Sequence, residues 1–239
     1  MSLSVLAADQ QAASHQPPGG LTSAQAPQFV LLGFDDNPDT EPMTWFVDTL
    51  KDRRNPAGRG SAATFDGGPV RAIFFSNGKH WNSRSLITIH HRALNEGHEI
   101  ANHTQNHHQG GAFDAAQWRT EITACAATYD ETGIPAKGVV GFRAPYLQYN
   151  AATFVALSAL GLAYDSSIEE GDHPDQDGTD FVWPYTLDSG SPGNAADFPA
   201  DSPRRVGKHP GLWEVPIHVF MIPSDEECAS HGVKPGLRA

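Results

Sequence analysis

The chain alternates short apolar segments with longer segments of helical periodicity. We expect strands at 29–36, 71–75, 99–103, 138–143, 164–165 and 212–218. Between them, apolar residues recur at helical spacing, which predicts helices at 43–50, 83–95, 114–132 and 150–160. Strands that are separated by helices pair in parallel, because each helix carries the chain back across the sheet. The sequence therefore predicts an α/β fold.

The expected organisation is one catalytic domain with a leader. A chain of 239 residues suits a single (β/α) barrel. We expect residues 1–27, which are polar and rich in Gln, Ala and Pro, to form a flexible leader, and residues 28–239 to form the domain. The stretch 3–8 is either the remainder of a secretion signal or a cloning scar. Residues 171–210 are rich in Asp, Gly, Pro and Ser, which predicts a long surface excursion.

The charge of the chain limits its partners. The formal net charge of -12 argues against nucleic acid or an anionic membrane as the main partner. No segment approaches the roughly 20 apolar residues of a membrane span, so we expect no membrane association.

Polar residues stand at the carboxyl ends of the expected strands. In a (β/α) barrel, the loops at these ends build the active site. The residues are Asp35, Asp36, His103, Arg143, Asp165 and His218.

One carboxylate with two imidazoles, His103 and His107, suits a zinc ion. Three protein ligands leave a position open for water, and the neighbouring carboxylate of the Asp35-Asp36 pair stays free to move a proton. Taken singly, the pair of aspartates also fits a turn or a helix cap, and the two histidines also fit a solvated surface. Only the combination favours a metal site.

The two cysteines leave two alternatives open. Cys125 falls on the apolar stripe of the expected third helix, with Trp118, Ile122 and Tyr129. We favour a buried, inert thiol over a disulfide with Cys228.

Three motifs resemble the polysaccharide deacetylases of carbohydrate esterase family four, which share the NodB homology domain. Gly33-Phe34-Asp35-Asp36 is similar to the first motif, Thr-Phe-Asp-Asp, with Gly in place of Thr. His103-Thr104-Gln105-Asn106-His107 matches the second, His-(Ser/Thr)-x-x-His. The stretch from Arg143 to Tyr146 resembles the third, Arg-x-Pro-Tyr. The resemblance implies a distorted (β/α) barrel of the NodB type.

The resemblance also implies roles for individual residues. Asp36, His103 and His107 would bind a divalent metal, zinc or alternatively cobalt. Asp35 would be the general base, held by Arg143, and the backbone N–H of Tyr146 would stabilise the oxyanion.

The chain departs from the family at its end. The fifth motif, which supplies a general-acid histidine, has no match, and the chain stops at Ala239, soon after the sixth expected strand. We therefore expect the last one or two strands to be absent, so that the chain is a fragment, or the acid to come from elsewhere. His218 is the local candidate.

Further stretches resemble the chitin deacetylases of arthropods, among them 53–56, 97–101, 140–147 and 183–186. They imply hydrolysis of N-acetyl groups on N-acetylglucosamine units of chitin or a related polysaccharide, outside the cell or in the periplasm. Pro145, Tyr149 and Trp183 are the expected sugar contacts, although core packing explains Trp183 equally well. The alternatives are an O-acetyl esterase acting on xylan and a non-catalytic carbohydrate-binding protein that retains the metal.

Overall fold

The computed structural model describes residues 11–170, 181–218 and 224–234. Its main element is a seven-stranded sheet with the order β1-β2-β3-β4-β5-β8-β7. The strands of this sheet are β1 (Gly33–Asp36), β2 (Ile73–Ser76), β3 (Glu99–Asn102), β4 (Gly141–Phe142), β5 (Tyr164–Asp165), β8 (Trp213–Glu214) and β7 (Tyr185–Thr186). A second sheet pairs β6 (Glu169–Glu170) with β9 (Ile217–His218).

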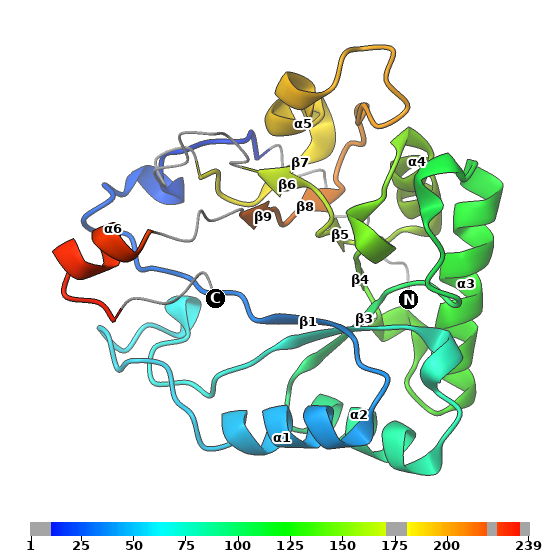
Figure 1. The fold of residues 1–239 in the computed structure, drawn as a ribbon, viewed down its shortest axis with the longest axis horizontal. Helices are drawn as coiled ribbons and strands as arrows, with labels where there is room; N and C mark the ends of the chain where they lie inside the picture. The colour runs from blue at the N-terminus through cyan, green and yellow to red at the C-terminus, as the bar shows by residue number, and fades with distance from the viewer. Residues whose placement is uncertain (1–10, 171–180, 219–223, 235–239) are drawn as a thin grey trace.

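All neighbours in the main sheet are parallel except β7 and β8. The register aligns Asp36 with Ser76 and Ser76 with Asn102, so β1, β2 and β3 end at the same edge. This confirms the predicted α/β fold. The described strands leave β1 and β7 as the two edges, so the sheet is a curved, open barrel (Figure 1).

Four helices lie outside the curved sheet, and two short ones follow later in the chain (Figure 1). They are α1 (Thr40–Leu50), α2 (Arg84–Asn95), α3 (Ala115–Glu131), α4 (Ala151–Leu160), α5 (Pro192–Asp197) and α6 (Asp225–Ser230). Side-chain caps fix the start of two of these helices. Asp114 and Gln117 form a capping box on α3, and Asn150 caps α4.

The core consists of two clusters of buried side chains. One lies between α1, α2 and the first strands and contains Met43, Phe74, Ile100 and Tyr129. The other joins α3 and α4 to the later strands. Cys125 is fully buried in the first cluster and is not in a disulfide, which confirms the buried-thiol interpretation.

Two expectations for the second half of the chain were wrong. The strand expected at 212–218 is split, because β8 pairs with β5 and β9 pairs with β6. Pro216 stands at the break, where it offers no N–H to a ladder. Within the expected excursion, β7 joins the main sheet and α5 follows it. The remainder of that stretch, 171–180, lies outside the described residues.

Part of the expected leader contacts the domain. The backbone N–H of Thr186 donates to the carbonyl oxygen of Gln11 at 2.9 Å, and that of Trp183 donates to Ser14 at 3.0 Å. Ala13 packs against the second core cluster. This stretch of the leader is therefore docked beside β7.

Among the described residues, no helix combines the length and the hydrophobicity that crossing a bilayer requires.

Candidate metal centre

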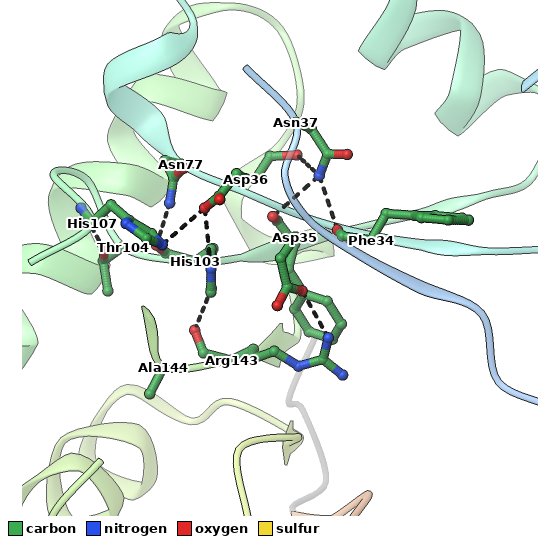
Figure 2. Close-up of polar contacts among 12 residues, drawn as sticks. Phe34, Asp35, Asp36, Asn37, Asn77, His103, Thr104, His107, Arg143 and Ala144 are labelled. Carbon is green, nitrogen blue, oxygen red and sulfur yellow. Dashed lines mark hydrogen bonds and ion pairs between the residues drawn. The ribbon is translucent and has the colours of Figure 1, made fainter. Parts of the chain in front are cut away.

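The turn after β1 places the two aspartates in different surroundings. Asp36 and Asn37 both have positive φ angles, of 65° and 48°. The Asn37 side chain holds this turn, because its Nδ2 donates to the carbonyl oxygens of Phe34 at 3.0 Å and Phe75 at 3.2 Å. Asp36 consequently faces the histidines, while Asp35 faces Arg143 (Figure 2).

His103 follows β3 directly and its side chain is buried. Its Nδ1 lies 2.7 Å from the carbonyl oxygen of Arg143. A carbonyl can only accept, so Nδ1 carries the proton and the Nε2 lone pair of the neutral ring is free to bind a metal. Burial lowers the pKa of His103, which favours this neutral form.

His107 reaches the same point from the loop after His103. The loop turns through left-handed backbone at Thr104 and His107, with φ angles of 69° and 56°. The Thr104 hydroxyl accepts the backbone N–H of His107 at 3.1 Å. Burial also lowers the pKa of His107, although this ring is only partly covered.

These side chains fit a metal ion. One ligand atom from each of Asp36, His103 and His107 lies within 4.8 Å of the others. Asp36 Oδ1 lies 2.8 Å from His107 Nε2 and 3.6 Å from His103 Nε2. This oxygen is buried and has no hydrogen-bond donor among the described residues. A buried carboxylate oxygen that faces imidazole lone pairs is stabilised by a cation between them.

Asp35 is bound by Arg143 rather than by the histidines. Arg143 Nη1 donates to Asp35 Oδ1 at 2.7 Å. The guanidinium is fixed on its other side, because Nε and Nη2 donate to the carbonyl oxygen and the hydroxyl of Ser166 at 2.8 and 2.9 Å. The Phe75 ring lies under it, 4.0 Å from its central carbon. Asp35 thus has a fixed cationic partner and is separate from the candidate metal ligands.

Of the remaining expected site residues, Tyr146 lies at the site. It belongs to the short turn Pro145–Leu147, its ring is exposed, and that ring lies 4.5 Å from the ring of His107.

Tyr149 and Pro145 are buried, and Trp183 is half-buried against Phe29 at 6.1 Å. The Tyr149 hydroxyl accepts a hydrogen bond from Asn194, and its ring packs in the core, so the expectation that it stacks on a sugar is wrong. His218, the local candidate for the acid, contacts the carbonyl oxygen of Val182 at 3.0 Å.

Sequence reasoning missed three residues around the histidines. Asn77 donates to the carbonyl oxygen of His103 at 2.9 Å. Glu121 of α3 accepts from Asn106, the residue before His107. Burial lowers the pKa of His80. The charge of Asp36 acts in the opposite direction and that of His107 in the same direction, so His80 senses the candidate site. Each stands outside the motifs, although Asn77 follows a strand end, which is a usable signal.

Part of the chain that carries the candidate site matches a known protein family. Residues 61–164 match the family model described as "Polysaccharide deacetylase". This stretch includes both histidines and Arg143, while the two aspartates of β1 precede it.

Two curated relatives are similar along much of the chain. A chitin deacetylase of Pestalotiopsis sp is 29% identical over 164 residues, which cover 66% of this chain and 48% of the relative. Chitin deacetylase 8 of Bombyx mori is 26% identical over 216 residues, which cover 87% of this chain and 51% of the relative. The chain spans about half the length of these two relatives.

Among solved structures, a family 4 carbohydrate esterase from Streptomyces lividans in complex with acetate matches with a TM-score of 0.44 and 21% identity. The match covers 59% of this chain and 64% of the esterase.

Proposed function

Since residues 61–164 match the family model described as "Polysaccharide deacetylase", we propose that this chain hydrolyses N-acetyl groups on N-acetylglucosamine units of chitin or a related polysaccharide and releases acetate. The observation that carries the proposal is that a possible metal-binding group and a paired carboxylate lie side by side where the strands of the sheet end. Asp36, His103 and His107 offer three ligand atoms, and Asp35 beside them is paired with Arg143.

Asp36, His103 and His107 would hold one divalent ion. Two imidazoles and one carboxylate favour zinc, with cobalt as the alternative. When bound, the ion lowers the pKa of a water molecule and polarises the acetamide carbonyl. The structure supports this assignment through the free Nε2 of His103 and the buried oxygen of Asp36.

Asp35 is the proposed general base. Its second carboxylate oxygen is left to accept a proton from the attacking water, because Arg143 occupies Oδ1. The charge-assisted hydrogen bond from Arg143 orients the carboxylate of Asp35. The two hydrogen bonds from Arg143 to Ser166 hold the guanidinium in place.

The backbone N–H of Tyr146 is the proposed donor to the oxyanion. The contact between the rings of Tyr146 and His107 keeps this turn next to the metal ligands. A donor that is already in place needs no reorganisation when charge develops on the carbonyl oxygen.

The exposed ring of Tyr146 and the half-buried ring of Trp183 are the proposed sugar contacts. An insoluble polymer as substrate favours a location outside the cell or in the periplasm. Within this proposal, residues 28–239 form the catalytic domain.

Acetate release tests the proposal. The chain is incubated with zinc or cobalt and with either a chitooligosaccharide or acetylated xylan, and the same reactions are run after chelation. We expect metal-dependent acetate release from the chitooligosaccharide. Release from xylan alone would make the chain an O-acetyl esterase. Absence of acetate release from either glycan, with metal bound, would favour the alternative of a non-catalytic carbohydrate-binding protein.

A further inference from the structure

Glu121 is an acidic residue on the buried face of α3. The face is otherwise made of Trp118, Ile122, Cys125 and Tyr129, and Glu121 is 9% exposed. A carboxylate is costly to bury unless donors surround it. The donors to Glu121 come from the loop that joins His103 to His107.

Asn106 supplies both donors. Its backbone N–H donates to Glu121 Oε2 at 2.8 Å, and its side-chain Nδ2 donates to Oε1 at 2.9 Å. The backbone carbonyl oxygen of Glu121 also accepts the N–H of Gln105 at 3.1 Å. One residue of α3 therefore holds two successive residues that immediately precede His107.

The start of the loop is held by Ile122, the residue of α3 that follows Glu121. Asn102 donates from Nδ2 to the carbonyl oxygen of Ile122 at 2.9 Å, and its Oδ1 accepts the N–H of Thr104 at 2.9 Å. The loop is thus fixed on α3 at both ends.

The backbone of the loop requires such support. Thr104 and His107 both adopt left-handed φ angles, which residues with a Cβ atom rarely occupy. Backbone of this kind persists where its surroundings determine it. In the absence of the Glu121 contacts, the peptide before His107 would relax, and Nε2 of His107 would leave its place 2.8 Å from Asp36 Oδ1.

We propose that Glu121 is a positioning residue of the metal centre, which holds Asn106 and thereby keeps His107 in the ligating position. The inference rests on the proposed metal site. It goes beyond the motifs, because Glu121 lies on a helix outside all three of them.

Cobalt affinity tests the inference. Both variants are made in the full chain. Glu121→Gln keeps the size of the side chain but replaces one carboxylate oxygen by an NH2 group, which cannot accept a hydrogen bond from Asn106. Glu121→Leu removes both acceptor oxygens. Substitution of a residue that orients a metal ligand typically lowers the affinity for the metal by about 10-fold to 100-fold. We expect the cobalt dissociation constant, measured by visible absorption, to rise by about 10-fold in Glu121→Gln and more in Glu121→Leu.

Two controls separate positioning from loss of stability. Glu131→Gln changes an exposed carboxylate of the same helix and should keep wild-type affinity. Ile134→Ala opens a cavity at a residue that is 2% exposed and should lower the melting temperature without changing affinity.

Hydrogen exchange of the metal-free protein gives an independent readout. The amide of Asn106, which is bonded to Glu121, should exchange faster in Glu121→Leu, where no acceptor remains, while the amides of β2 keep their protection. Wild-type affinity and wild-type exchange in both Glu121 variants would overturn the inference, as would an equal loss of affinity in Ile134→Ala. A wild-type chain that binds no cobalt would overturn the metal site itself, and the inference with it.

Discussion

His103 donates a hydrogen bond from Nδ1 to the backbone carbonyl oxygen of Arg143, at 2.7 Å. The contact joins the ends of β3 and β4 and turns Nε2 toward Asp36. The same residue pair therefore connects the proposed metal ligands to the arginine that holds Asp35.

His103→Ala should abolish tight metal binding, because one of three ligands is lost. Elemental analysis after gel filtration measures the metal content. His231→Ala is the matched control, since this exposed histidine lies at the end of α6, outside the candidate site. Stoichiometric metal in His103→Ala would contradict the assigned site.

The carboxyls of Asp165 and Glu214 should make stability depend on pH. They are aligned across β5 and β8 and are both fully buried. Burial raises the pKa of Asp165 from 3.8 to about 6, and burial with the charge of Asp165 raises the pKa of Glu214. The folded state therefore holds protons that the unfolded state releases, so this stabilisation is present below about pH 3.8 and is lost as the pH rises through about 6.

Glu214→Gln should weaken this dependence, because the amide can donate to an ionised Asp165. Each unit of pKa shift corresponds to about 1.4 kcal/mol. Melting temperatures of the metal-free proteins at pH 5 and pH 8 measure the effect, and the variant should lose less stability across this interval than the wild type. Glu131→Gln controls for the removal of one charge. An unchanged pH dependence in Glu214→Gln would refute the explanation.

Tyr149→Phe should change stability and not substrate affinity. The substitution removes a buried hydroxyl that accepts from Asn194 at 3.0 Å, which costs about 1 kcal/mol. The ring does not reach solvent, so KM for a chitooligosaccharide should stay the same. Tyr146→Ala, which removes an exposed ring beside His107, should instead raise KM. A raised KM in Tyr149→Phe would return Tyr149 to the sugar contacts.

Both cysteines should titrate as thiols. In denaturant without reductant, a chromogenic thiol reagent should detect two thiols per chain. In the native protein, Cys125 should react far more slowly, because burial raises its pKa to about 12 and leaves little thiolate. Detection of no thiol in denaturant would show a disulfide.

The convergence of Asp36, His103 and His107 was predictable because parallel strands end at a common edge. Asp36 ends β1 and His103 follows β3, and the register of the sheet aligns those ends. The alternation of strand and helix predicts that these strand ends lie together, and the motifs indicate which of the residues there suit a metal ion.

The supporting residues were not predictable from the same patterns. Glu121 lies within an apolar stripe, where periodicity predicts only burial, and its partners come from a loop of irregular backbone. Similarly, β7 is two residues long and lies in a stretch rich in turn formers, so its pairing with β8 depends on tertiary contacts.

We propose that Asp35 and Asp36 have separate roles, with Asp35 in proton transfer and Asp36 in metal binding. Asp35→Asn tests it most directly, when metal content and acetate release from a chitooligosaccharide are measured on the same sample. In this variant we expect stoichiometric metal and acetate release reduced by about 10² to 10⁴. Stoichiometric metal with near wild-type release would contradict the role of Asp35 as the base, and loss of the metal would contradict its separation from the ligands.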